Sequence, residues 1–336
     1  MDCKTSAARV EKKRGGRVME RIELLYRKAE QGQAISKTEA LFLAEQELGI
    51  LCAAADSLRK KACGDDFDLC AIINGKSGRC SENCKFCAQS AHYRTGATFY
   101  ELLDEQSILA AAQKCKASGV RRFSVVTSGK RLTDSEVERL CGIYRRIGEE
   151  CGLKVCASHG LLTRAQFNML KQAGVSRYHN NLETSRRYFP KICTTHSYDD
   201  KLAVIRATQE AGLAVCSGGI IGMGETMEDR IDMVLDLRTL GIRSIPINIL
   251  EPIDGTPLSS RPVLHEAEAA RTAAVFRFLM PDAQIRLAGG RAHLRDRGKT
   301  LLGAGVNAAI TGDMLTTAGT TAEQDAEMIR LCGFCL

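Results

Sequence analysis

Three cysteines lie close together in the stretch CSENCKFCAQS, which spans residues 80–90: Cys80, Cys84 and Cys87. A structural zinc site needs four Cys or His ligands, and His92 is the nearby residue that could complete one. Three thiolates that hold a 4Fe–4S cluster instead leave one iron free to bind a substrate or cofactor. The spacing therefore favours an iron–sulfur cluster with an open coordination position over a zinc site of three Cys and one His.

The elements around these cysteines follow an alternating pattern. Residues 18–63 have helical periodicity, and Ser36 with Glu39 predicts a capping box at the start of the second helix. Beyond them, short β-like runs alternate with amphipathic helices, which is typical of a parallel sheet. The eight predicted strands are residues 67–73, 121–128, 153–159, 175–183, 213–220, 243–250, 283–290 and 306–312.

Eight βα units predict the fold class, a (β/α)8 TIM-type barrel with an N-terminal helical extension. An open doubly wound sheet is the alternative, but no GxGxxG motif follows the first strand. The three cysteines come directly after that strand, at the carboxyl end of the barrel, where such enzymes hold their active sites. We expect a flexible N-terminal arm at residues 1–17 and a single domain at residues 18–336, which includes the N-terminal helices at 18–63.

Composition limits the compartment and the partners. Fifteen of the 336 residues are cysteine, and the charged N-terminus lacks the apolar segment of a secretory signal. Clustered thiols in a cytoplasmic protein bind metal or do chemistry more often than they form disulfides. The net charge is +7, but no basic run is interleaved with aromatic residues, and no apolar run could span a bilayer. We therefore expect a cytoplasmic protein that binds neither nucleic acid nor membranes.

The cysteine motif also carries a family resemblance. CxxxCxxC with an aromatic residue, Phe86, before the last cysteine is the signature of the radical S-adenosylmethionine superfamily. Within that superfamily the chain resembles the biotin synthase family over residues 36–330, and several motifs together make the resemblance specific. They are YHNNLETS (178–185), CTTHSYDDK (193–201), VCSGGIIGMGET (215–226), SIPINILEPIDGTPL (244–258), IRLAGGR (285–291) and LTT (315–317).

The resemblance implies a sulfurtransferase that makes biotin from dethiobiotin. In this family a 4Fe–4S cluster, here on Cys80, Cys84 and Cys87, binds S-adenosylmethionine and cleaves it to a 5′-deoxyadenosyl radical. That radical abstracts hydrogen from carbons 9 and 6 of dethiobiotin, and an auxiliary iron–sulfur cluster supplies the sulfur. A reducing protein such as flavodoxin or ferredoxin provides the electron, and the family is usually a homodimer.

The resemblance also implies ligand contacts for four residues. Phe86, Asn181 and Glu183 match positions at S-adenosylmethionine, with Glu183 standing where the family usually has Asp. Asn181 and Asn248 match positions at the ureido ring of dethiobiotin, to which an amide offers both a donor and an acceptor. For each Asn, the alternative is a strand-end polar group that is satisfied within the protein.

The auxiliary cluster is where the sequence departs from the family. Cys156, Cys216 and Arg286 match three of its four ligands, but Ser124 replaces the fourth, a cysteine. Cys70, Cys156, Cys216 and Arg286 lie on alternate predicted strands, and the side chains of one barrel layer come from alternate strands. We therefore expect Cys70 to complete the set, around a 2Fe–2S or larger cluster.

Other interpretations of these ligands stay open. Cys193 is a further candidate, and so are Cys332 and Cys335 in the C-terminal CGFC sequence. For Cys70 the alternative is a small buried apolar side chain. For Arg286 the alternative is a salt bridge to a carboxylate in the core, although we favour a place beside the cluster.

Two other functions remain as alternatives. One is a related radical enzyme without sulfur insertion, similar to a hydrogenase maturase or a carbon-skeleton mutase. Cys156 and Cys216 argue against it, because those relatives generally lack the auxiliary set. The other is a non-catalytic iron–sulfur protein that carries electrons or sulfur. It would use four cysteines per cluster, and the three-cysteine loop argues against it.

Overall fold

Parallel strands form a closed barrel in the computed structural model, which describes residues 3–317 and 319–336, with side chains from residue 16 onward. Its strands are ordered β5-β4-β3-β2-β1-β9-β8-β7-β6, and the pairing of Cys216 with Ser244 closes the sheet. Because β5 and β6 are the two halves of the fifth predicted strand, the eight predicted barrel positions are confirmed. The strands are β1 (Asp68–Lys76), β2 (Arg122–Thr127), β3 (Lys154–Ser158), β4 (Val175–His179), β5 (Ala214–Cys216), β6 (Gly219–Ile221), β7 (Ser244–Ile249), β8 (Gln284–Leu287) and β9 (Ala308–Thr311).

The fifth predicted strand is interrupted between β5 and β6 by a side-chain contact. The backbone N–H of Gly218 donates to Oδ1 of Asn181 at 3.1 Å. A Cβ atom on Gly218 would lie 2.0 Å from the carbonyl oxygen of Pro246, so only glycine fits at this close approach. The break thus brings strand backbone against a predicted site residue.

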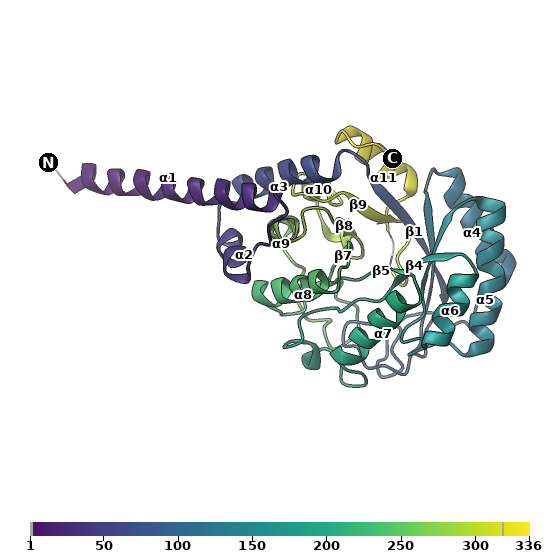
Figure 1. The fold of residues 1–336 in the computed structure, drawn as a ribbon. Helices are drawn as coiled ribbons and strands as arrows, with labels where there is room; N and C mark the ends of the chain where they lie inside the picture. The colour runs from purple at the N-terminus through teal and green to yellow at the C-terminus, as the bar shows by residue number, and fades with distance from the viewer. Residues whose placement is uncertain (1–2, 318) are drawn as a thin grey trace.

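Helices surround the outside of the barrel (Figure 1). They leave strands such as β7 covered on both faces, and β7 is accordingly buried along nearly its whole length. The helices are α1 (Cys3–Glu30), α2 (Lys37–Ala44), α3 (Leu48–Cys63), α4 (Glu105–Ala117), α5 (Asp134–Arg146), α6 (Arg164–Gln172), α7 (Tyr198–Glu210), α8 (Met227–Thr239), α9 (Glu266–Leu279), α10 (Lys299–Leu302) and α11 (Ala322–Leu331), with the short helical turns η1 (Ile147–Cys151), η2 (Phe189–Lys191) and η3 (Arg291–His293). Among the described helices, none combines the length and the apolarity needed to cross a bilayer.

The N-terminal helices extend the barrel on one side. The predicted capping box of Ser36 and Glu39 is confirmed at the start of α2. Helix α3 packs along α9, α2 contacts α8 and α9, and α1 projects away from the barrel (Figure 1). Helix α1 begins at Cys3, inside the expected arm, so the division at residue 17 stays a prediction. Residues 1 and 2 of that arm lie outside the described residues.

A buried guanidinium positions the start of β8. Arg277 on α9 donates through Nη2 to Oδ1 of Asn307 at 2.8 Å, and through Nε to the carbonyl oxygen of Gly305 at 2.8 Å. The same Oδ1 of Asn307 accepts the backbone N–H of Ile285 at 2.9 Å. Since Arg286 follows Ile285, this network holds the strand segment that carries a predicted site residue.

Candidate active site

A cavity of ≈ 380 Å³ lies inside the barrel and opens toward the carboxyl ends of its strands. Residues from every barrel position contribute to its wall. The lining includes the predicted contacts to S-adenosylmethionine and dethiobiotin, together with the four main candidates for the auxiliary cluster. These residues are Cys70, Phe86, Cys156, Asn181, Glu183, Cys216, Asn248 and Arg286.

The cysteine loop follows β1 and reaches this cavity. The backbone N–H of Cys87 donates to the carbonyl oxygen of Cys84 at 3.0 Å, which makes a tight turn between these two ligands. The backbone N–H of Cys80 donates to the carbonyl oxygen of Gln89 at 2.9 Å and so closes the loop on itself. Phe86, between the second and third cysteines, lines the cavity. The loop therefore reaches, through Phe86, the same space that the predicted substrate contacts line.

The surroundings of these thiols suit a thiolate-ligated cluster. Backbone N–H groups of Gln89 and Ser90 act to lower the pKa of Cys87, and those of Glu82 and Gly129 act in the same direction on Cys80. Backbone N–H groups near thiolates stabilise them as metal ligands. Burial has the larger effect and raises the pKa of Cys87 to about 11, so binding a metal must displace the proton. The loop fits a 4Fe–4S cluster by its donor chemistry.

The geometry does not support the zinc alternative that uses His92. Nε2 of His92 hydrogen-bonds to the carbonyl oxygen of Ser81 at 2.9 Å, which directs the ring to the backbone. In the described part of the chain, Cys84, Cys193 and His196 are the group whose ligand atoms lie within 4.8 Å of one another, and His92 is not in it.

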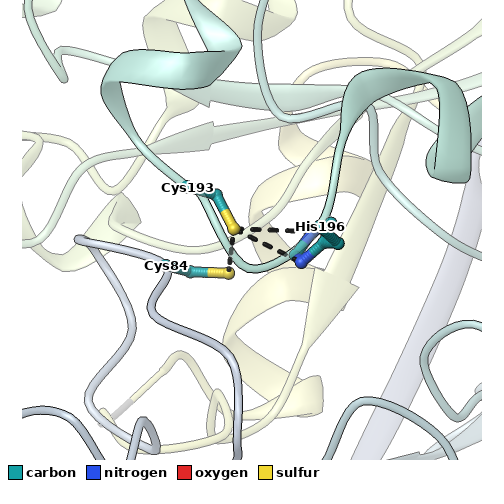
Figure 2. A group of neighbouring side chains, drawn as sticks. All are labelled: Cys84, Cys193 and His196. Atoms are coloured by element: carbon teal, nitrogen blue, oxygen red, sulfur yellow. Dashed lines mark hydrogen bonds between the residues drawn. The ribbon is translucent and has the colours of Figure 1, made fainter.

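Cys193 lies beside the cysteine loop and not with the other candidate auxiliary ligands. Its sulfur is 3.8 Å from that of Cys84 (Figure 2), and it does not line the cavity. The hydrogen bond from Cys84 is the main effect that lowers the pKa of Cys193 to about 3, and the same contact raises the pKa of Cys84. The two sulfurs thus share one proton. We therefore correct the prediction that places Cys193 with the auxiliary set, because its loop is attached to the CxxxCxxC segment by the bond from Lys85 N–H to the Ile192 carbonyl.

Three arginines meet one carboxylate at the amino-terminal end of the barrel interior. Oδ2 of Asp68 lies 2.7 Å from Nη2 of Arg286 and 3.3 Å from Nη1 of Arg177, and Oδ1 lies 3.9 Å from Nε of Arg122. Burial acts to raise the pKa of Asp68, but the charges of Arg286, Arg177 and Arg122 lower it to about 2. The salt bridge considered for Arg286 is therefore present. Arg286 also lines the cavity, and its place beside a cluster stays a prediction.

Three buried thiols lie next to this charged group. Nη1 of Arg122 is 3.4 Å from Sγ of Cys156. Burial raises the pKa of Cys70 and of Cys156. Burial acts on Cys216 in the same direction, but a hydrogen bond from His179 and nearby positive charges lower its pKa to about 6. One thiolate at neutral pH, in surroundings with excess positive charge, suits the binding of an anionic iron–sulfur cluster.

The strand register places Ser124 and Cys70 at different depths of the barrel. Ser124 pairs with Ile72 on β1 and with Cys156 on β3, and it lines the cavity as a ligand would. Cys70 pairs with Arg122, two residues before Ser124. Cys70 therefore lies one inward-facing position deeper than the serine that replaces the expected cysteine.

Asn181 and Glu183 are held together after β4. Oδ1 of Asn181 accepts from the Gly218 N–H, and Nδ2 donates to Oε2 of Glu183 at 3.3 Å. Glu183 has a φ of 71°, a left-handed conformation that is uncommon outside glycine and short polar residues. Burial raises the pKa of Glu183. A strained backbone at a partly buried carboxyl group that lines a cavity is typical of a functional position.

Asn248 is also oriented by backbone groups. Its Nδ2 donates to the carbonyl oxygen of Gly219 at 3.1 Å, and its Oδ1 accepts from the N–H of Gly289 at 3.0 Å. A primary amide has two N–H groups and two acceptor lone pairs. After these bonds, Asn248 retains one donor and one acceptor position beside the cavity. The strand-end bonding and the predicted ligand contact are therefore compatible.

Known proteins similar to this chain identify its family. Residues 76–237 match the Radical SAM superfamily, and residues 246–335 match the Biotin and Thiamin Synthesis associated domain. The biotin synthase of Akkermansia muciniphila is 55% identical over 90% of this chain and 94% of its own length. A biotin synthase of Clostridium botulinum (strain Alaska E43 / Type E3) is also 55% identical, over 90% of this chain and 95% of its own length. The chain belongs to the biotin synthase family.

Solved structures of more distant proteins share the barrel. Methylornithine synthase superposes with a TM-score of 0.80 at 19% identity, over 92% of this chain and 96% of that chain. The FeFe-hydrogenase maturase HydG from Carboxydothermus hydrogenoformans has a TM-score of 0.77 at 17% identity, over 98% of this chain and 82% of its own. At these identities, the similarity confirms the barrel fold of this chain and carries no information about its function.

Sequence reasoning missed four polar residues around the cavity of this biotin synthase family member: Asp68, Arg122, Arg177 and His179. Asp68, Arg122 and Arg177 each lie two residues before an inward-facing strand residue. The period of two along a strand could therefore have placed them in the interior. Their mutual pairing depends on register between strands far apart in sequence, which no local pattern contains.

The C-terminal cysteines lie apart from the cavity. Cys335 is exposed, and its backbone forms an isolated parallel β-bridge with that of Asp66. Cys332 is partly buried. Neither lines the cavity. The structure thus does not bring this pair to the candidate auxiliary ligands of the biotin synthase family member.

Proposed function

We propose that the chain is a biotin synthase, a sulfurtransferase that converts dethiobiotin to biotin. One observation carries this proposal: a single cavity joins the edge of the CxxxCxxC loop, two strand-end amides and three buried thiols. When bound, the 4Fe–4S cluster and S-adenosylmethionine supply a 5′-deoxyadenosyl radical that removes hydrogen from carbons 9 and 6 of dethiobiotin, while an auxiliary iron–sulfur cluster supplies the sulfur.

The loop and the end of β4 bind S-adenosylmethionine. Cys80, Cys84 and Cys87 would hold the 4Fe–4S cluster through their thiolates, and backbone N–H groups near Cys80 and Cys87 favour the thiolate form. Phe86 and the Asn181–Glu183 pair form the adjacent cavity wall. The carboxyl of Glu183, which lines the cavity, offers acceptors for hydroxyl donors such as those of a ribose. These contacts hold the cofactor between the loop and the substrate.

Asn181 and Asn248 orient dethiobiotin. Asn181 retains one N–H and one lone pair after its bonds to the Gly218 N–H and to the Glu183 carboxyl, and Asn248 retains the same after its two backbone bonds. These free groups match the carbonyl oxygen and ring N–H of a ureido group. Because the existing bonds fix both amides in advance, binding costs little side-chain entropy. The surrounding barrel excludes water and other side chains from the reacting carbons.

Cys70, Cys156, Cys216 and Arg286 hold the auxiliary cluster. All four line the cavity, and the excess positive charge of the arginines offsets the negative charge of thiolate ligands. An enzyme that performs radical chemistry without sulfur insertion has no use for three buried thiols beside its substrate. A simple electron carrier has no use for the ligand-sized cavity.

The partners and the compartment follow from the same chemistry. We infer that a reducing protein such as flavodoxin or ferredoxin delivers the electron. We also infer that the chain functions as a homodimer in the cytoplasm. The reducing compartment is supported by the described cysteines from Cys52 onward, which are all free thiols.

Iron and sulfide analysis tests this function. The native chain, a variant with Cys80, Cys84 and Cys87 changed to Ala, and a Cys70→Ala variant are purified without oxygen. Their iron and acid-labile sulfide are counted, and each is assayed for biotin formation from dethiobiotin. We expect the triple variant to retain one cluster and to make no biotin. We expect Cys70→Ala to keep the 4Fe–4S cluster and lose the auxiliary one. A native chain with a single cluster and no biotin formation would overturn the proposal.

A further inference from the structure

A compact group of metal-binding side chains adjoins the cysteine loop: Cys84, Cys193 and His196 (Figure 2). In a tetrahedral zinc site with Zn–S bonds of about 2.3 Å and Zn–N bonds of about 2.0–2.1 Å, two sulfurs lie about 3.8 Å apart and a sulfur and a nitrogen about 3.6 Å apart. The sulfurs of Cys84 and Cys193 are 3.8 Å apart. The sulfur of Cys193 lies 3.3 Å and 3.8 Å from Nδ1 and Nε2 of His196. The separations therefore match those of ligands around one ion.

The imidazole is oriented as a ligand by a buried carboxylate. Nδ1 of His196 lies 2.6 Å from Oε2 of Glu82, and the two side chains are 4% and 8% exposed. A histidine that binds metal usually donates its other ring N–H to a carboxylate. Since Glu82 takes the Nδ1 hydrogen, Nε2, which lies 3.8 Å from the sulfur of Cys193, is the ring nitrogen left to bind a metal. This arrangement leaves a fourth coordination position for water or another donor.

The ligands are held in place by the chain itself. The two segments that carry them are more than a hundred residues apart, and Asn83 joins them: its Oδ1 accepts the N–H groups of Thr194 at 2.9 Å and Thr195 at 3.2 Å. Its own N–H donates to Oγ1 of Thr195 at 3.1 Å. The neighbouring bond from Lys85 N–H to the Ile192 carbonyl adds a fourth tie at 2.9 Å. The site is thus preorganised without a metal.

We propose that the cluster-free chain binds one thiophilic divalent cation of the Zn²⁺ type through Cys84, Cys193 and His196. Cys84 is also one of the three ligands of the CxxxCxxC cluster, so an ion held here and a complete cluster exclude each other. The binding of the ion stands on geometry alone. The exclusion rests on the proposed function, because it requires the 4Fe–4S cluster on the loop.

Metal titration of the full-length chain tests the site. The chain is purified without oxygen and stripped with a chelator. It is then titrated with Co²⁺ to follow the sulfur-to-metal charge-transfer band, and with Zn²⁺ against a chromophoric chelator. We expect Cys193→Ser and His196→Asn to weaken Zn²⁺ binding tenfold to a hundredfold or more. Cys80→Ala, which removes a cluster ligand outside this site, should change the affinity less than about threefold.

Two further variants separate metal binding from folding. Cys115→Ala removes a thiol on α4, away from the site, and should leave the affinity unchanged. Glu82→Gln should weaken Zn²⁺ about tenfold while the Co²⁺ charge-transfer band keeps the intensity of two thiolates, because Glu82 positions a ligand and is not one. If Cys193→Ser binds Zn²⁺ like the native chain, or if Cys80→Ala loses as much affinity as Cys193→Ser, the site is wrong.

Cluster assembly tests the exclusion separately. One equivalent of Zn²⁺ is added to the stripped chain before reconstitution with iron and sulfide. The native chain should then incorporate about four fewer irons, one cluster's worth, whereas Cys193→Ser should incorporate its full amount. Equal iron in the native chain with and without Zn²⁺ would overturn the exclusion. Failure of the native chain to assemble the loop cluster even without Zn²⁺ would instead count against the proposed function.

Discussion

Changing Asp68 to Asn should destabilise the barrel substantially. The pKa of Asp68 falls from 3.8 to about 2 in the folded chain. At about 1.36 kcal/mol for each unit, this difference corresponds to about 2.4 kcal/mol of stability at neutral pH. The carboxylate is 13% exposed, so solvent screening removes little of this value. Asp68→Asn also leaves the buried Arg286 and the partly buried Arg122 and Arg177 without an anion, and breaking a buried pair on one side costs about 3–5 kcal/mol. We therefore expect a loss of about 2–5 kcal/mol.

Urea unfolding of the cluster-free chain at pH 7 measures this loss. Asp66→Asn is the matched control, because Asp66 lies two residues earlier, is 68% exposed and contacts Arg121 at 3.4 Å. An exposed pair of this kind contributes less than about 1 kcal/mol. A double variant that also carries Arg286→Met should recover part of the loss, because it removes one unpaired buried charge.

The pH dependence gives a second measure of the same effect. The folded-state pKa of Asp68 is lowered, so its contribution is complete above the unfolded value of 3.8 and is lost as the pH falls through about 2. The difference between native chain and Asp68→Asn should therefore stay constant from pH 7 to about pH 4 and shrink below it. A difference under about 1 kcal/mol at pH 7 would refute the reasoning, and so would one that stays the same down to pH 2.5.

Three further predictions concern residues that line the cavity. Asn248→Ala removes a fixed donor and acceptor, so it should raise the KM for dethiobiotin about tenfold or more in steady-state assays and leave the iron content unchanged. An unaltered KM would contradict the ureido contact. In the cluster-free chain, the rate at which iodoacetamide alkylates Cys216 should have its midpoint near pH 6, since the pKa of Cys216 is about 6, whereas burial keeps Cys70 unreactive at that pH. Mass spectrometry of the alkylated peptides distinguishes the two cysteines, and equal alkylation rates would argue against the assigned charges. Gly290→Ala should destabilise the chain by about 1–3 kcal/mol in urea unfolding, because the φ of Gly290 is +79° and a Cβ would lie 2.1 Å from the carbonyl oxygen of Ile249. Unchanged stability of the variant would contradict this steric account.

The fold could be predicted because each barrel position has a local signal. Apolar strand runs, caps such as Ser36 with Glu39, and glycines at helix ends repeat along the chain, and the structure confirms every predicted strand. The break between β5 and β6 was not predictable, because it arises where the Gly218 N–H bonds to a side chain from another strand. Period and propensity describe neighbours in sequence, and that contact joins residues 37 positions apart.

The part of the candidate site that consists of motif residues could be predicted from the sequence. The motif residues around the cavity come from strands and loops that the barrel brings together. Cys193 shows where this reasoning stops. Its distance from Cys84 depends on how the segment after η2 folds onto the cysteine loop through Asn83, which is a tertiary contact between two irregular segments. Periodicity carries no information about such contacts.

The replacement of the expected cysteine by Ser124 has a consequence for the chemistry of the auxiliary site. Moving a ligand from position 124 to Cys70 shifts it one inward-facing step toward the amino end of the barrel. That step brings the ligand set closer to Arg122 and to the charged group around Asp68, since Arg122 contacts both Cys156 and Asp68. Three guanidinium groups against one carboxylate can balance more negative charge than a single arginine can. We propose that, with Cys70 as a ligand, this deeper and more strongly compensated set of thiolates holds a larger or more highly charged cluster than an arrangement centred on position 124 would.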